Sequence, residues 1–260
     1  MPRPDEVAFP SRKERFEDRR KEGEHRKLRD EFFDHATLLA ISRLVTQGQF
    51  DTLDFPIATG KEGGVFRASS AAGFRAVKVY RIGNSVFRSL PPHVIEEFRR
   101  ESSERNFARL VSAWTRREHT ILRKMREADV AVPEPAAYLR NVLVMEFIGT
   151  DGVASPRLND ARSADPAALF DDLAVQVRRM VVGAGLVHGD LSPYNVLLHE
   201  ERPVLIDVAQ AIPAKHPQAR DLLVRDLRNF AKFFARLGVV REFPDVWSAA
   251  GGTSLNPVEA

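Results

Sequence analysis

The stretch that decides the fold reads His188-Gly189-Asp190-Leu191-Ser192-Pro193-Tyr194-Asn195, and it is followed by Pro203-Val204-Leu205-Ile206-Asp207. Asp190 and Asn195 lie five residues apart in one polar segment, and Asp207 ends an apolar run. Apolar runs at residues 196–198 and 204–206 predict two short strands. The pattern therefore predicts a loop that carries Asp and Asn, followed by strands of which the second ends in Asp.

These three polar residues are the types that metal-assisted phosphoryl transfer needs. One carboxylate accepts a proton from the attacking hydroxyl or water, while an amide oxygen and a second carboxylate hold the metal ion at the phosphates. A carboxylate at the end of a buried strand is costly unless it is paired or binds metal. Each residue alone is equally compatible with a helix cap or a turn. Together, Asp190, Asn195 and Asp207 favour phosphoryl transfer.

A second group of candidates lies in a strand-rich stretch after residue 55. Apolar runs at 65–68 and 74–80 predict two strands joined as a hairpin. Lys78 alternates with valines, so it faces the side opposite to them, where it needs anions such as ATP phosphates; on an edge strand it would face solvent instead. The preceding loop, Thr59-Gly60-Lys61-Glu62-Gly63-Gly64, fits neither the Walker nor the G-x-G-x-x-G pattern, but its glycines allow backbone amides to approach phosphates closely.

A helix predicted from about residue 94 to residue 128 supplies a candidate partner for Lys78. Glu118 lies on this helix, one to two turns before a run of apolar positions. Glu101 and Glu104 lie on the same predicted helix and compete for the role. Because glutamates are common on helix surfaces, the residues alone leave this choice open.

The order of the predicted elements indicates an α+β protein with two lobes. Helical patterns at 32–50 come first, a strand at 142–145 links the halves, and a helix beginning at Asp165-Pro166 opens the helix-rich half. We expect a small strand-rich lobe hinged to a mainly helical lobe. The predicted segments are a charged N-terminal arm (1–31), an N-terminal helical extension (32–55), the N-lobe (56–146), a reduced C-lobe (147–240) and a C-terminal tail (241–260).

Composition narrows the class of protein further. The 260 residues contain no cysteine, which excludes a disulfide framework and thiolate metal sites. The N-terminus has no signal-peptide core, and the apolar runs are far too short to span a bilayer, so the predicted location is cytoplasmic. The net charge of +3 weakly favours an acidic partner such as RNA or a nucleotide, and it fits an ordinary solvated surface equally well.

Taken together, these motifs resemble the RIO family of atypical serine/threonine protein kinases and ATPases, and its RIO-one subfamily in particular. The resemblance covers about residues 37 to 234. It implies a bilobal protein-kinase-like fold with a reduced C-lobe. The segments that carry it are Thr59-Gly60-Lys61-Glu62, Ala76-Val77-Lys78-Val79-Tyr80, Val144-Met145-Glu146-Phe147-Ile148-Gly149, Pro156-Arg157-Leu158, the His188–Asn195 motif and Ile206-Asp207-Val208-Ala209-Gln210.

The resemblance implies ATP with Mg²⁺ or Mn²⁺ as cofactors, and it assigns a role to each candidate residue. Family members also act as ATPases through an aspartyl phosphate, for which Asp207 is the candidate acceptor here. The implied roles are Asp190 as catalytic base, Asn195 and Asp207 as metal ligands, Lys78 at the α- and β-phosphates with Glu118 as its partner, Gly60 and Lys61 at the nucleotide, and Glu146 and Ile148 as hinge residues whose backbone binds adenine.

The sequence departs from the family pattern at two places. Gly63-Gly64 stands where the subfamily usually has Ala-Asn, which predicts a looser phosphate loop. Pro193 stands where an acidic residue is usual, and we expect it to alter how the loop meets its substrate. Neither change removes a residue that the ATP chemistry requires.

Three functions remain open on the sequence alone. Only 53 residues follow Asp207, and no D-F-G or A-P-E motif is present, so the peptide-binding surface is reduced. This favours autophosphorylation, ATPase switching or few protein substrates. A small-molecule phosphotransferase of the aminoglycoside or choline kinase type shares the same Asp, Asn and Asp spacing. A non-catalytic, ATP-gated scaffold on ribosomal particles is the third alternative, because the family is tied to maturation of the small ribosomal subunit.

Overall fold

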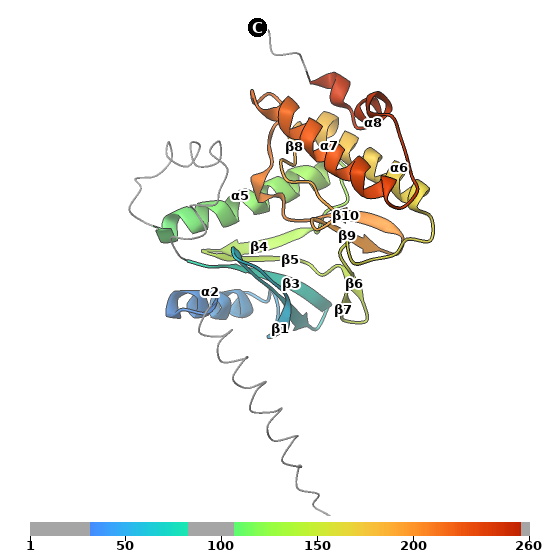
Figure 1. Cartoon of the computed structure of the whole chain (residues 1–260). Coiled ribbons are helices and arrows are strands. Elements are labelled where there is room, and N and C mark those ends of the chain that lie inside the picture. Colours follow the sequence, from blue (N-terminus) through green and yellow to red (C-terminus); the bar gives the residue numbers. More distant parts are fainter. Residues whose placement is uncertain (1–31, 83–106, 256–260) are drawn as a thin grey trace, which may run out of the picture.

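The computed structural model describes residues 32–82 and 107–255 (Figure 1). The predicted charged arm at 1–31 lies outside the described residues. The first part of the predicted long helix, with Glu101 and Glu104, lies outside them as well. The second part of that helix is present as α5 (Phe107–Glu127).

The N-lobe is built on a five-stranded antiparallel sheet with strand order β1-β2-β3-β5-β4. Lys78 lies at its centre, opposite Val65 on one neighbouring strand and Leu143 on the other. It therefore occupies an interior strand and not an edge. The strands are β1 (Thr52–Thr59), β2 (Gly63–Ser70), β3 (Gly73–Tyr80), β4 (Pro135–Leu139) and β5 (Val142–Glu146).

Alternation along β3 divides the two faces of this sheet, as the sequence predicts. Val77 and Val79 are fully buried in a core that they share with Leu44 of α2 (His35–Thr46). Ala76 and Lys78 face the other side, toward the second lobe. The Asp34 carboxylate caps α2 by accepting a hydrogen bond from the Thr37 amide at 2.7 Å. The helix thus closes the outer face of the sheet and leaves the Lys78 face to line a cavity (Figure 1).

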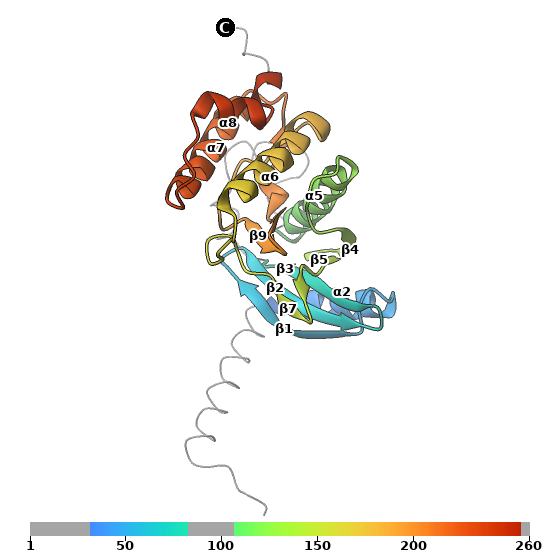
Figure 2. The ribbon, with the colours of Figure 1, turned by 90° about the vertical axis from the view of Figure 1, so that its right-hand side faces the viewer.

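In the C-lobe, three helices gather on the side of a short hairpin that faces away from the sheet, and the first of them packs against the hairpin (Figure 2). The Asp165 side chain caps α6 (Pro166–Arg178), which confirms the predicted start at Asp165-Pro166. The Phe170 ring stacks on Phe230 with centroids 4.7 Å apart, which joins α6 to α7 (Ala219–Ala235). The other elements are η1 (Arg179–Gly183), β8 (Leu186–Val187), β9 (Val196–His199), β10 (Arg202–Leu205), η2 (Val208–Gln210), β11 (Ile212–Pro213), α8 (Phe243–Ala249) and η3 (Gly252–Ser254).

The structure differs from the predicted segment limits at two places. Residues 52–55, expected in the helical extension, form the first half of β1. The expected tail from residue 241 contains α8, whose Val246 is buried in the C-lobe core together with Ala250 and Leu255. The folded part of the tail therefore belongs to the C-lobe.

Helix α5 belongs to neither lobe alone. It crosses between the sheet and the C-lobe helices (Figures 1 and 2). Its Leu122 and Met125 are buried in the larger core, with residues of α6 and α7. Arg117 donates hydrogen bonds to the carbonyls of Ala209 (3.1 Å) and Ala211 (2.7 Å), just after Asp207. These hydrogen bonds tie α5 to the segment that follows Asp207. Among the helices of the described ranges, none is both long and apolar enough to cross a membrane.

Candidate active site between the lobes

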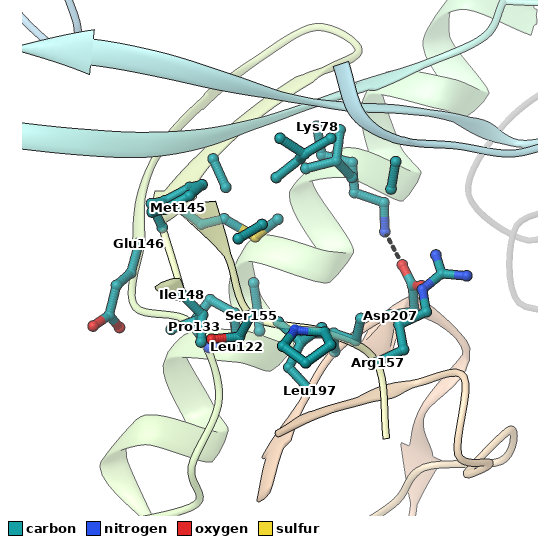
Figure 3. A pocket seen from close by; sticks show the side chains of 18 of the residues that line it. Lys78, Leu122, Pro133, Met145, Glu146, Ile148, Ser155, Arg157, Leu197 and Asp207 are labelled. Atoms are coloured by element: carbon teal, nitrogen blue, oxygen red, sulfur yellow. Dashed lines mark hydrogen bonds and ion pairs between the residues drawn. The ribbon is translucent and has the colours of Figure 1, made fainter. Parts of the chain in front are cut away.

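Two adjoining cavities, of about 450 and 230 Å³, occupy the space between the sheet and the β9–β10 hairpin. Volumes of this order suit a small-molecule ligand. The larger cavity has an apolar end near the hinge and a charged end at Lys78 and Asp207 (Figure 3). The smaller one continues from the charged end and is lined by Gly60, Lys61, Glu62, Asp190 and Asn195 among others. All the sequence-predicted site residues thus line one cleft.

Lys78 joins the two lobes at the charged end. Its Nζ lies 2.7 Å from Glu118 Oε1 and 2.7 Å from Asp207 Oδ1. Burial alone would lower the pKa of Lys78, but the carboxylates of Asp207 and Glu118 raise it overall, so the amine stays charged. The structure therefore brings Lys78 and Glu118 together across 40 residues, as the family resemblance implies.

Glu118 is held in a fixed orientation inside α5. Its side chain is only 2% exposed, and its second carboxylate oxygen accepts a hydrogen bond from the Tyr80 hydroxyl. Burial raises the pKa of Glu118, against the opposing effect of Lys78. Because removal of either partner leaves a buried charge, this pair fixes α5 against β3.

Asp207 follows β10 in a left-handed backbone conformation, with φ of 57°. Residues other than glycine rarely adopt this left-handed conformation. Here the Asp207 carboxylate faces Lys78. The adjacent Lys78 charge lowers the pKa of Asp207, against the effect of burial, so this carboxylate is ionised. Its side chain remains 41% exposed, which leaves room for a ligand.

Asp190 and Asn195 are held to each other by one amide group. Asn195 Nδ2 donates to the Asp190 carbonyl at 2.8 Å and to its Oδ2 at 3.1 Å. The Ile206 amide donates to the Asn195 carbonyl at 3.0 Å, which ties the loop to the end of β10 beside Asp207. The Asp190–Asn195 loop and the strand end at Asp207 therefore meet in space. The side-chain oxygen of Asn195 takes no part in these hydrogen bonds.

Asp207 and Asn195 suit a magnesium ion that is bound together with nucleotide phosphates. A carboxylate and an amide oxygen are hard ligands, and Mg²⁺ usually takes only one or two protein carboxylates alongside phosphates and water. In the part of the chain that the structure describes, no three His, Cys, Asp or Glu side chains gather closely enough to enclose a metal ion by themselves. The donor set therefore fits a metal–nucleotide complex better than a closed metal cage.

Asp226 of α7 is hydrogen-bonded to the start of the loop that carries Asp190. Its Oδ2 accepts a hydrogen bond from the Gly189 amide at 2.8 Å, and Arg225 donates to the Gly189 carbonyl. Asp226 is completely buried, and this burial raises its pKa to about 7. His188, also buried, donates from Nε2 to the Ile206 carbonyl at 3.1 Å, and burial lowers its pKa, so the ring is neutral. Buried side chains thus position the start of the loop that carries Asp190 and Asn195.

The turn between β1 and β2 forms the opposite wall of the cleft. The Gly60 amide donates to the Gly63 carbonyl at 2.9 Å, which closes a tight turn over Lys61 and Glu62. Gly63 and Gly64 lie in β2, opposite Tyr80 and Val79, and a Cβ on Gly63 would come within 2.4 Å of the Val79 carbonyl. The glycine pair therefore lies in the strand that leaves the turn, and the looser loop expected from it stays a prediction.

The hinge residues line the apolar end of the larger cavity. Glu146 ends β5, and its amide donates to the Glu134 carbonyl at 2.8 Å. The Ile148 carbonyl accepts from Ser155 at 3.0 Å, across the hairpin of β6 (Gly149–Thr150) and β7 (Val153–Ala154). Both hinge residues are therefore part of the wall where adenine is expected.

A sequence model of the RIO domain matches residues 64–246, which is more than half of the chain and includes every part of the charged end except the β1–β2 turn. The chain belongs to the RIO kinase family. It is therefore an enzyme of the kinase class, and the family expected from the motifs is confirmed.

Curated relatives agree with this RIO assignment over most of their length. The "RIO-type serine/threonine-protein kinase Rio1" of Haloferax volcanii is 40% identical over 86% of this chain and 77% of that protein. The protein of the same name from Methanocaldococcus jannaschii is 34% identical over 95% and 85%. Among solved structures, the Rio2 kinase–ADP/Mg²⁺–phosphoaspartate complex from Chaetomium thermophilum gives a TM-score of 0.64 at 23% identity, over 85% of this chain and 68% of that one. This likeness confirms the predicted bilobal α+β fold.

Two charged residues of the cleft in this RIO chain were not assigned a role from the sequence. Glu62 is part of a motif that carries the resemblance; it lines the smaller cavity, and burial raises its pKa. Arg157 belongs to another such motif, and it lines both cavities. The motifs include both residues, but only the fold shows that their side chains line the cleft.

Proposed function

We propose that this RIO protein transfers the γ-phosphoryl group of Mg-ATP to a serine or threonine hydroxyl. The observation that carries the proposal is the position of Lys78, bonded at 2.7 Å to both Glu118 and Asp207 and facing the cleft that also holds Asp190 and Asn195. A buried lysine with two carboxylates is poised to meet phosphates, which replace part of its interaction with Asp207. The names of the relatives support the serine/threonine kinase class.

Each charged residue has a distinct role in this proposal. Asp190 accepts the proton of the attacking hydroxyl, while Lys78, oriented by Glu118, binds the α- and β-phosphates. Asp207 and Asn195 hold the metal ion, which neutralises charge at the phosphates. Ionisation of Asp207, favoured by the adjacent Lys78, keeps its oxygens available as ligands.

The remaining candidates bind the nucleotide. In the proposal, Gly60 and Lys61 contact phosphate oxygens from the β1–β2 turn. The backbones of Glu146 and Ile148 pair with adenine at the apolar end, where aliphatic side chains cover the ring. Adenine therefore fixes one end of ATP and leaves the γ-phosphoryl group between Lys78 and Asp190.

In the proposed phosphoryl transfer, one bond to the γ-phosphorus forms as another breaks. The hydroxyl oxygen forms a bond to the γ-phosphorus, the bond from that phosphorus to the β–γ bridging oxygen breaks, and ADP leaves. The hydroxyl proton passes to the Asp190 carboxylate. Alternatively, an oxygen of Asp207 attacks the γ-phosphorus and water later hydrolyses the acyl phosphate, which is the ATPase route. The phosphoaspartate of the Chaetomium Rio2 complex supports Asp207 as a candidate acceptor.

Labelled ATP tests the proposal and separates the two routes. Purified protein is incubated with γ-labelled ATP and Mg²⁺, and the protein-bound label is then exposed to acid, to base and to hydroxylamine. We expect label that resists acid for a phosphoserine or phosphothreonine, and label that hydroxylamine releases for an aspartyl phosphate. No incorporated label and no released phosphate, from protein that binds Mg-ATP, contradicts the proposed function.

Association with precursors of the small ribosomal subunit, or with their RNA, remains a proposal that rests on the family resemblance. Co-sedimentation with ribosomal particles, with and without ATP, tests it. Absence from the particle fractions under both conditions contradicts the association and leaves the proposed phosphoryl transfer unaffected.

A further inference from the structure

The backbone of Arg157 pairs with β9, the strand that begins directly after Asn195. Arg157 lies between β7 and α6, and its backbone forms a bridge with Leu197 of β9. The Leu158 amide donates to the Val196 carbonyl at 2.8 Å, and the Leu198 amide donates to the Pro156 carbonyl at 2.9 Å. Hydrogen bonds on both sides of Arg157 therefore fix its backbone beside the predicted metal ligands.

The Arg157 side chain points into the charged end of the cleft. Figure 3 shows its guanidinium beside the Asp207 carboxylate, and Arg157 lines both adjoining cavities. Lys78 is the main cause of the lowered pKa of Asp207, and Arg157 lowers it further. Within residues 32–82 and 107–255, the Arg157 guanidinium makes no hydrogen bond or ion pair, so its donors are available to a ligand.

The cations considered so far at the charged end do not neutralise the transferred phosphoryl group. Lys78 is balanced by Glu118, and Asp207 and Asp190 add two further negative charges that one divalent metal ion neutralises. The transferred phosphoryl group then brings charge of its own, and arginine binds phosphate oxygens with two parallel N–H donors. Lys61, another cation of the cleft, lies on the opposite wall in the β1–β2 turn.

We propose that Arg157 is a catalytic residue that binds the transferred phosphoryl group and stabilises its charge in the transition state. The inference rests on the proposed function. As the bond between the γ-phosphorus and the bridging oxygen breaks, the new bond forms to the hydroxyl oxygen, or to an oxygen of Asp207, and the hydroxyl proton goes to Asp190. Arg157 gains and loses no proton; its guanidinium binds the oxygens of the phosphoryl group as it moves.

Three variants test this role against a matched control. Arg157→Gln keeps hydrogen bonding without charge, Arg157→Lys keeps charge without the planar fork, and Arg157→Ala opens space for added guanidinium ion. Arg202→Gln is the control, because Arg202 is an exposed arginine at the start of β10, away from the cleft. The measurements are the single-turnover rate of phosphoryl transfer at saturating Mg-ATP and the dissociation constants of adenosine, ADP and ATP.

We expect Arg157→Gln to lower the transfer rate by about a hundredfold, a typical effect of losing one charge-stabilising donor, with adenosine and ADP affinities unchanged. Arg157→Lys should be intermediate, Arg202→Gln should match the wild type, and millimolar guanidinium should restore part of the rate of Arg157→Ala. A rate of Arg157→Gln equal to that of Arg202→Gln contradicts the inference alone. A loss of rate that is accompanied by equal loss of adenosine affinity, without rescue, indicates a structural role and also contradicts it. Wild-type protein that binds Mg-ATP without turning it over contradicts the proposed function, and the inference with it.

Discussion

The two ends of the cleft are built in opposite ways. The apolar end is lined by side chains such as Ala76, Met145 and Leu197, which carry no charge and are placed by strand alternation. The charged end gathers Lys78, Glu118, Asp190, Asn195 and Asp207 from both lobes, and its geometry depends on hydrogen bonds of 2.7 to 3.1 Å. In the proposed function, one end supplies surface for the nucleotide base, and the other supplies ionised groups for its phosphates.

This difference separates binding from chemistry. Burial of a flat ring against aliphatic side chains stabilises the bound substrate and the transition state equally, which affects affinity. Charged groups that face the phosphates act most strongly when charge moves, which affects rate. Substitutions at the two ends should therefore alter different kinetic constants.

The largest effect is expected for Asp207→Asn at the charged end. This change removes a proposed metal ligand, the candidate phosphate acceptor and one partner of Lys78. The rate of phosphoryl transfer should fall on the order of a thousandfold, and Mg²⁺ should no longer strengthen nucleotide binding. Transfer rates and ATP affinity measured across an Mg²⁺ titration check this, with Asp171→Asn on the exposed face of α6 as control. An unchanged Mg²⁺ dependence of nucleotide binding in Asp207→Asn argues against the metal assignment.

Lys78→Arg should have the next largest effect. The larger guanidinium cannot occupy the position where the amine lies 2.7 Å from both Glu118 and Asp207, although the charge is kept. We expect kcat to fall by about a hundredfold with a smaller change in adenosine affinity. Steady-state kinetics and a thermal melt, compared with Lys232→Arg on α7, separate this from unfolding. Equal activity of the two variants would rule out the proposed role of Lys78.

Leu197→Ala probes the apolar end. Loss of the proposed aliphatic contact with adenine should weaken both adenosine and ATP binding by about tenfold, which corresponds to ~1.4 kcal/mol. The transfer rate at saturating ATP should not change, because the charged groups stay in place. Calorimetric titration and single-turnover kinetics give the two quantities. A reduced saturated rate with normal affinity would overturn the division between the two ends.

The last prediction concerns the stability of the fold and not its kinetics, at Asp226 beneath the charged end. Its pKa of about 7 lies above the ordinary value of 3.8, so its protonated form stabilises the fold below pH 3.8, and this stabilisation is lost as pH rises through about 7. Between pH 5 and pH 8 the wild type should lose up to roughly 3 kcal/mol of stability relative to Asp226→Asn, at ~1.4 kcal/mol for each pH unit up to about 7. Denaturant unfolding across this range provides the check; parallel stability curves would mean that Asp226 is ionised throughout.

Much of the charged end could be predicted because its residues lie in local patterns. The Asp190–Asn195 spacing and the apolar strands before Asp207 are visible in one stretch, and alternation in β3 gave the direction of Lys78. Glu118 could not be chosen from its neighbours alone, since only the packing of α5 against β3 brings it to Lys78, 40 residues away. Local patterns therefore identify most residues of the charged end, and the tertiary fold identifies the partner of Lys78.

Other features were hidden because they depend on contacts between distant segments. Arg157 enters the cleft through a bridge to Leu197, which no spacing rule indicates. Helix α8 is short and lies beyond the family motifs, and Val246 is buried only because α6 and α7 provide a surface for it. The left-handed backbone of Asp207, a residue type that adopts it less readily than glycine, is likewise a product of the surrounding fold.

The central claim, that the charged end performs phosphoryl transfer while the apolar end binds the nucleotide, is tested most directly with Asp190→Ala. Calorimetry gives its dissociation constant for Mg-ATP, and quenched single-turnover reactions of the same sample give its transfer rate. We predict a dissociation constant within about threefold of the wild type and a transfer rate reduced by about a thousandfold, in the range for loss of a general base. Transfer at the wild-type rate would contradict the account.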